Sequence, residues 1–183
     1  MTTDRTGAIS AMMLIIEPLI PRLRRYARSL MSDAATADDL VQDCLERAIR
    51  AWPQRREDGD ARAWMFAILH NLAVNRLRQA QRRGAHVGLD DAVDIEMARP
   101  PSQEHAVRLA ELMAALDNLP ADQRSVLLLV SVEDLSYEET ARVLGVPIGT
   151  VMSRLSRGRQ KLLQVMDPER VATPKAPHLR RVK

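Results

Sequence analysis

The stretch LSYEETARVLGVPIGTVMSRLSRGRQKLL, residues 135–163, predicts two helices joined by a tight turn. Ser136, with Glu139 three residues later, forms the capping-box pattern that starts a helix. Gly145 can adopt the left-handed conformation that ends this helix, because it has no Cβ. Pro147 then supports the start of the second helix. The stretch therefore encodes a helical hairpin or a helix-turn-helix.

The second of these helices separates apolar from polar side chains. At about 100° per residue, its apolar residues fall on one side: Ile148, Val151, Leu155 and Leu162. Hydrogen-bond donors fall on almost the opposite side, here called the recognition face: Thr150, Ser153, Arg154, Arg157 and Lys161. A hairpin that only packs does not require such a face, whereas a helix that reads the DNA major groove does. We therefore favour a helix-turn-helix, with the packed hairpin as the alternative.

Composition indicates an all-α protein. The chain has 183 residues, enough for one compact domain or two small ones. Hydrophobic residues make up 46 % but aromatic residues only 3 %, which favours helices packed through aliphatic side chains. The net charge of +3 is small, yet basic and acidic residues occupy different segments. This segregation suits both an anionic and a cationic partner, or else solvated charged faces.

Several classes of function find no support in the sequence. Cys44 is the only cysteine, so an internal disulfide is impossible and a small core residue is the simplest interpretation. The histidines have no ligand spacing, so we expect no metal and no cofactor. The apolar run 11–16 ends at Glu17 and is too short for a membrane span or signal peptide, which predicts a cytoplasmic protein without membrane insertion. No nucleophile–base pair or phosphate-binding glycine loop indicates an enzyme.

The chain divides into two helical blocks. We expect the first block at residues 1–83, a flexible linker rich in glycine and proline at 84–103, the second block at 104–167 and a basic, disordered tail at 168–183. In the first block, helices are predicted over Leu19–Leu30, from near Asp38 to Pro53, and over Asp60–Arg83. Thr36 is the expected cap of the second of these helices.

Two helices of the first block carry distinctive faces. The helix after Asp38 has a buried stripe at helical spacing: Val41, Cys44, Leu45, Ala48 and Trp52. Its opposite side, here called the acidic face, gathers Asp39, Gln42, Asp43 and Glu46. That face is either solvated or a docking surface for a basic partner.

The third helix predicts a core side and a polar side. The core side holds Met65, Ile68, Leu69 and Leu72. The other side, here called the amide face, holds Ala67, Asn71, Asn75, Arg78 and Arg82, with Trp64 at its border. Amides, arginines and an indole are suited to single-stranded nucleic acid, which needs base-edge hydrogen bonds, phosphate charge and stacking. Core packing of Trp64 is the alternative.

Together these segments resemble a known family. The chain is similar to bacterial sigma factors in three segments. In order, with a linker before the third, they are ADDLVQDCLERAIRAW, RAWMFAILHNLAVNRLRQ and LPADQRSVLLLVSVEDLSYEETARVLGVPIGTVMSRLSRGRQKL. The resemblance is to the small extracytoplasmic-function group, which keeps regions 2 and 4. It covers about residues 19–83 and 104–165. It implies an all-α fold of two helical domains and a transcription initiation factor that has no catalysis of its own.

The resemblance also implies site residues and partners. Region 2 would bind the β′ clamp helices of core RNA polymerase through DLVQD, at Asp39, Leu40, Gln42 and Asp43. It would capture the −10 element as single-stranded DNA through Trp64, Asn71, Asn75 and Arg78, with residues 55–60 as the loop that holds a flipped base. Region 4 would contact the β flap and read −35 DNA with the recognition face. The linker, with its acidic patch 90–96, would thread toward the RNA-exit path, and an anti-sigma factor is expected to cover the polymerase-binding faces.

Two departures from the family pattern lie in the recognition helix. Met152 stands where many relatives carry Lys or Arg, which removes a phosphate contact, and Gly158 stands where many carry Ala, which predicts a less rigid helix.

Two other functions remain as alternatives. A stand-alone helix-turn-helix regulator would leave the acidic face and the amide face unexplained. A decoy that only sequesters an anti-sigma protein would not need a recognition face.

Overall fold

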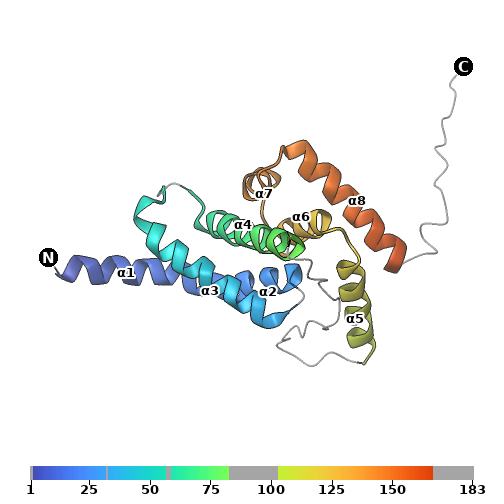
Figure 1. Cartoon of the computed structure of the whole chain (residues 1–183), viewed down its shortest axis with the longest axis horizontal. Coiled ribbons are helices and arrows are strands. Elements are labelled where there is room, and N and C mark those ends of the chain that lie inside the picture. Colours follow the sequence, from blue (N-terminus) through green and yellow to red (C-terminus); the bar gives the residue numbers. More distant parts are fainter. Residues whose placement is uncertain (1, 32, 57–58, 83–102, 167–183) are drawn as a thin grey trace, which may run out of the picture.

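The described part of the chain is helical throughout its regular elements. The structure is a computed structural model that describes residues 2–31, 33–56, 59–82 and 103–166. Its helices are α1 (Thr2–Ile16), η1 (Glu17–Leu19), α2 (Ile20–Leu30), α3 (Ala34–Ala51), η2 (Trp52–Gln54), α4 (Ala61–Arg82), α5 (Gln103–Asp117), α6 (Ala121–Ser131), α7 (Tyr137–Leu144) and α8 (Ile148–Met166) (Figure 1). The all-α prediction is confirmed. Most of the predicted linker, with its acidic patch, and the basic tail lie outside the described residues.

Helix α1 was missed by the sequence analysis, which predicted a helix only from Leu19. The 3₁₀ turn η1, with Pro18 at its start, joins α1 to α2. Met12 and Ile16 are buried, whereas Leu14 is 76 % exposed, and α1 extends away from the other helices (Figure 1). No helix in the described ranges is long and apolar enough to cross a membrane.

Helix α3 begins earlier than predicted and has a different cap. The Asp33 carboxylate accepts hydrogen bonds from the backbone N–H of Ala35, at 3.3 Å, and of Thr36, at 2.7 Å. Hydrogen bonds from Thr36, first from its side chain and then from its backbone, lower the pKa of Asp33. The prediction of Thr36 as the cap was therefore wrong. An aspartate is at least as good a cap as a threonine, and here it stands three residues earlier.

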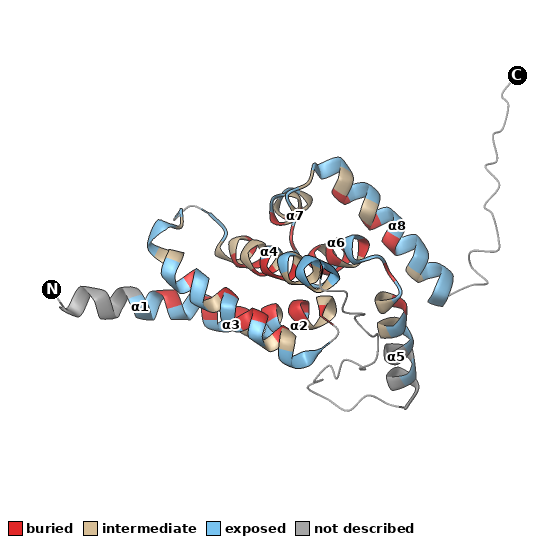
Figure 2. Ribbon diagram, in the orientation of Figure 1, coloured by how far each residue is buried: buried red, intermediate tan, exposed pale blue. Residues whose placement is uncertain are grey.

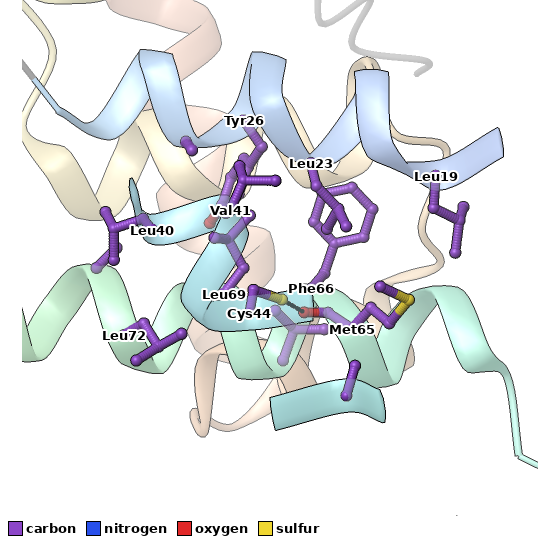
Figure 3. Packing of buried hydrophobic residues seen from close by; sticks show 14 of the residues in the cluster. Leu19, Leu23, Tyr26, Leu40, Val41, Cys44, Met65, Phe66, Leu69 and Leu72 are labelled. Carbon is purple, nitrogen blue, oxygen red and sulfur yellow. Dashed lines mark hydrogen bonds between the residues drawn. The ribbon is translucent and has the colours of Figure 1, made fainter. Parts of the chain in front are cut away.

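Helices α2, α3 and α4 enclose the core of the N-terminal unit, defined as α1 to α4 (Figure 3). Tyr26 and Phe66 meet edge to face with ring centroids 5.4 Å apart, and both are fully buried. Cys44 is also buried, with its Sγ 3.5 Å from the carbonyl oxygen of Met65. Burial raises the pKa of the Cys44 thiol to about 12. The interpretation of Cys44 as a core residue is confirmed.

The C-terminal unit, α5 to α8, packs directly against the N-terminal unit. Helix α7 lies against α4, and α6 contacts α2. Buried side chains of the C-terminal unit join the core of the N-terminal unit: Leu128, Leu129, Leu135 and Val143. The buried faces of α4 and α6 accordingly turn toward the middle of the molecule (Figure 2). The C-terminal unit also has a smaller core of its own, made of Leu119, Val126, Leu127, Val151 and Leu155. Although the sequence predicts two blocks on a flexible linker, the larger core is shared between the two units.

Candidate functional site

The acidic face of α3 is open to solvent. Asp39, Gln42 and Asp43 are exposed, as the helical wheel predicts. Asp39 also reaches α4, where Nη2 of Arg76 lies 3.5 Å from its Oδ2. Leu40, in contrast, is 1 % exposed and belongs to the core. Leu40 is one of the residues that line the hollow between α3 and α4. Its place among the polymerase contacts stays a prediction.

A hollow of about 590 Å³ links the acidic face with the amide face. It lies between α3 and α4, and Asp43, Arg47, Asn75 and Arg76 are among its lining residues. Asp43 belongs to the predicted polymerase contact and Asn75 to the predicted −10 contact. The two predicted sites are therefore adjacent parts of one surface, although they come from different helices.

The amide face of α4 presents the predicted donors. Asn71, Asn75, Arg78 and Arg82 are all exposed. Trp64 is half-buried, and its ring meets that of Trp52 at a steep angle, with centroids 6.0 Å apart. Trp64 also packs against the core of the N-terminal unit. One part of the Trp64 indole is therefore packed in the core, as the alternative interpretation predicts. The rest of the side chain is accessible at the border of the amide face.

Arg55, before α4, contacts three of the described residues around it and was not singled out from the sequence. The Arg55 guanidinium lies 4.8 Å from the ring centroid of Trp52. Its Nη1 donates to the carbonyl oxygens of Arg56, at 3.0 Å, and Gly59, at 2.7 Å. Asp60 then caps α4, because its Oδ1 accepts from the backbone N–H of Arg62 at 2.9 Å. Arg55 comes three residues after Trp52, and that spacing was the available signal.

The helix-turn-helix is built as the sequence predicts. Ser136 and Glu139 form a reciprocal capping box, with N–H to side-chain oxygen distances of 2.8 and 3.1 Å. Gly145 ends α7 in the left-handed conformation, with φ of 64°. On α8, Val151 and Leu155 are buried. The local signals of residues 135–163 thus fix both helices and the turn between them.

The recognition face is only partly as predicted. Ser153, Arg157 and Lys161 are exposed, and Thr150 is half-buried. Arg154 instead turns toward α6, where its Nε lies 3.0 Å from Oδ2 of Asp122 and its side chain is 25 % exposed. The outward placement of Arg154 was therefore wrong for this arrangement. Its long side chain reaches a carboxylate on the neighbouring helix, which a helical wheel does not represent.

Gly158 serves packing in this structure. A Cβ built on Gly158 would lie 2.8 Å from Cδ1 of Leu127, and the residue is buried. The missing side chain therefore permits the close approach of α8 to α6. The prediction of a less rigid helix did not take into account this packing of Gly158 against Leu127, which holds the middle of α8 against α6.

The described residues contain no group of three or more His, Cys, Asp or Glu placed to hold a metal ion. His70 is largely buried, and its Nδ1 lies 3.0 Å from the Tyr26 hydroxyl. Burial, and then the charge of Arg154, lower the pKa of His70 to about 4. A neutral His70 in the core is suited to packing and hydrogen bonding.

Comparisons with known proteins agree with this geometry. A family model described as the Sigma2 domain of PhyR matches residues 16–70, and one described as Sigma-70, region 4, matches residues 109–162. The chain is 38 % identical over 143 residues to the ECF RNA polymerase sigma factor EcfG of Rhodopseudomonas palustris, covering 78 % of each chain. The chain belongs to the extracytoplasmic-function sigma factors. Members of this family are not enzymes in the catalytic sense.

Two further relatives of this sigma factor extend the comparison. It is 37 % identical over 165 residues to the ECF RNA polymerase sigma factor SigE of Mycolicibacterium smegmatis, covering 87 % of this chain and 64 % of that one. A solved structure of the sigma factor RpoE in complex with the anti-sigma factor NepR, from Bartonella quintana, superposes with a TM-score of 0.74 at 31 % identity. That match covers 88 % of this sigma factor and 98 % of RpoE.

Proposed function

We propose that this sigma factor directs promoter-specific initiation through the acidic face and the adjoining amide face of the N-terminal unit and through the recognition face of the C-terminal unit. The acidic face of α3 binds the β′ clamp helices of core polymerase, with Asp39, Gln42 and Asp43 exposed for that contact. The amide face of α4 and the loop before it take up the −10 strand. The recognition face of α8 reads the −35 duplex, and the C-terminal unit contacts the β flap. The protein acts in the cytoplasm, where core polymerase and promoter DNA meet.

One observation carries this proposal: all three faces occur in the same chain, and each has predicted contact residues that are exposed, among them Asp43, Asn71 and Arg157. A stand-alone regulator would need the recognition face alone. Exposed amides and arginines on α4 and carboxylates on α3 supply the opposite charges that DNA and a basic protein surface require. Run-off transcription with purified core polymerase tests the function. Promoter-dependent transcripts are expected from core with this chain and not from core alone, and their absence would favour the stand-alone regulator.

Control by an anti-sigma factor is part of the proposal. RpoE, at 31 % identity, was solved with the anti-sigma factor NepR bound. This sigma factor exposes large apolar side chains on α8: Ile148, Met152, Leu163, Val165 and Met166. Tyr137, Met152 and Leu163 also line a hollow of about 420 Å³ between α7 and α8. An apolar surface of this kind supports a protein partner that covers the C-terminal unit.

We expect Arg157→Ala to weaken −35 recognition. Arg157 is exposed on α8, and its Nε donates to the Ser153 carbonyl oxygen one turn earlier, at 3.2 Å. Loss of one base-reading arginine costs about 1–3 kcal/mol and relaxes specificity at that position. Promoter variants in the −35 element, assayed by run-off transcription, measure the effect. Arg159→Ala, also exposed on α8 but off the recognition face, is the matched control. Unchanged −35 dependence in Arg157→Ala would remove this residue from the reading surface.

Asn71→Ala is expected to impair promoter melting without weakening polymerase binding. Its amide is exposed on α4 and contributes base-edge hydrogen bonds that matter only after the strands separate. Trp64→Ala should impair melting as well, but it should also lower stability because the indole packs against Trp52. Permanganate reactivity of −10 thymines reports melting, and thermal unfolding separates the two variants. Normal reactivity in both would leave Trp64 as a packing residue alone.

A further inference from the structure

A buried carboxylate joins the two units. Glu133 lies in the connection between α6 and α7, and its side chain is 1 % exposed. Its Oε2 is 2.6 Å from Nε of Arg22, and its Oε1 is 3.0 Å from Nη2 of Arg25, both on α2. Burying a carboxylate is costly unless it is paired and hydrogen-bonded. Glu133 therefore depends on these two arginines of the N-terminal unit.

A third arginine completes the site. Arg62, in the first turn of α4, directs Nη1 to the Glu133 carbonyl oxygen at 3.3 Å and Nη2 to that of Asp134 at 3.4 Å. Arg22 also donates to the Glu133 carbonyl oxygen, at 2.7 Å. Asp134 has a φ of 52°, a left-handed conformation that is rare outside glycine. The chain thus turns sharply to insert one acidic segment into an arginine cradle, defined as Arg22, Arg25 and Arg62.

This closed arrangement is not compatible with simultaneous contact to both promoter elements. The −10 and −35 elements are centred about 25 base pairs apart, which is roughly 85 Å at 3.4 Å per base pair. Helices α4 and α8, which carry the two reading faces, are each only about 30 Å long at 1.5 Å per residue, and their units share a core. The two units must therefore separate when the sigma factor occupies a promoter.

Separation removes the carboxylate from the cradle. The N-terminal unit retains three guanidinium groups and one paired carboxylate, Asp60, whose Oδ2 lies 3.5 Å from Nε of Arg62. Glu133 and Glu139, which is 4.0 Å from Arg62, leave with the C-terminal unit. The nearby arginine Arg24 has its own partner, Asp38, at 3.0 Å. Counting only the carboxylates among the described residues, the vacated cradle would carry two uncompensated positive charges. Its forked donors match a carboxylate or a phosphate.

We propose that the arginine cradle binds a backbone phosphate of the −10 strand once the units separate, and that Glu133 occupies this phosphate site in the closed chain. Position favours DNA as the ligand. Arg62 is in the first turn of α4, two residues beyond Asp60, where the proposed base-capturing loop ends. The inference rests on the proposed function, because it takes the −10 strand to pass along α4.

The arginine cradle could serve to hold the units together, to bind phosphate, or both. Two sets of variants distinguish these roles, because one changes Glu133 and the other changes the arginines that pair with it. Glu133→Gln weakens the closed contact but leaves the cradle intact, whereas Arg22→Ala with Arg25→Ala weakens the contact and removes the phosphate ligands. If the arginines only hold the units together, both variants should behave alike on DNA. If they bind phosphate, the variants should differ. Arg24→Ala, on the same helix but outside the cradle, is the matched control.

The measurement is the salt dependence of open-promoter complexes formed by core polymerase with each full-length variant. Each phosphate contact on a single strand contributes about 0.7 to the slope of log K against log salt. The double arginine variant is expected to lower the slope by roughly 0.7 to 1.4, equivalent to about a tenfold weaker complex at moderate salt. Glu133→Gln and Arg24→Ala should keep the parental slope.

The outcomes distinguish the claims. Parental complexes together with an unchanged slope in the double arginine variant would overturn the phosphate site and leave the proposed function standing. Absence of any promoter complex with the parental chain would overturn both. A double variant that keeps its slope but escapes inhibition by an anti-sigma protein would assign the cradle to an acidic protein segment, contrary to this inference.

Discussion

Replacing Asp39 and Asp43 by arginine is expected to abolish binding to core polymerase while the helical fold persists. Both carboxylates are exposed on α3, on the side away from the buried residues Val41 and Cys44. Exposed substitutions usually change stability by less than about 0.5 kcal/mol. Two arginines facing a basic polymerase surface would place like charges together, at a cost of several kcal/mol. Co-elution with core polymerase and thermal unfolding measure the two effects separately.

Because Asp39 contacts Arg76, this experiment needs a control for the effect of the substitutions on stability and net charge. The substitution Asp39→Arg would bring a second guanidinium close to Arg76 at the edge of the hollow, but an exposed ion pair contributes only about 0–1 kcal/mol. The matched control reverses two exposed carboxylates of the C-terminal unit, Glu111 and Glu138, for the same change in net charge. If the Asp39/Asp43 variant co-elutes at parental affinity, the acidic face is merely solvated and the polymerase contact lies elsewhere.

Local signals explain why the helix-turn-helix could be predicted in detail. The capping box of Ser136 and Glu139 and the left-handed Gly145 each involve residues within four positions of one another. Periodicity likewise identified Val41, Cys44 and Ala48 as buried residues of α3, whereas Leu45 and Trp52 of the predicted stripe are half-buried. It also placed the amides of α4 on an exposed side, because another side of that helix meets the core. The polymerase and DNA surfaces became interpretable from the sequence only through resemblance to the sigma family. Their assignments stay predictions.

Longer-range features left no comparable signal. Arg22 and Glu133 are 111 positions apart, so no pattern along the sequence connects them. Arg154 illustrates a second limit, since a helical wheel gives the direction of Cβ and not the place that a long guanidinium reaches. Helix α1 was missed because its last two turns, residues 9–16, are almost uniformly apolar and lack the alternation that marks an amphipathic helix. Tertiary contacts decided the first two of these features, the ion pair of Arg22 with Glu133 and the placement of Arg154.

Those tertiary contacts predict that the two units unfold together, and Leu129→Ala tests this directly. Leu129 belongs to α6 of the C-terminal unit, yet it is fully buried within the core that it shares with the N-terminal unit. Truncating a buried leucine to alanine costs about 2–5 kcal/mol, through lost burial and the cavity left behind. For a chain of this size, that corresponds to a fall in melting temperature on the order of 10 °C.

The chain contains its own reporter for this coupling. It has two tryptophans, Trp52 and Trp64, and both lie in the N-terminal unit. Tryptophan fluorescence therefore follows unfolding of the N-terminal unit, whereas far-ultraviolet circular dichroism follows the helices of both. Leu129→Ala should lower the two midpoints equally. Leu163→Ala, at an exposed position of α8, should leave both midpoints nearly unchanged, because it should change the free energy of unfolding by less than about 0.5 kcal/mol. A fluorescence midpoint that stays parental while circular dichroism shows an earlier transition would mean that the units fold independently. The shared core would then contribute little to stability, and core polymerase could separate the units at almost no cost.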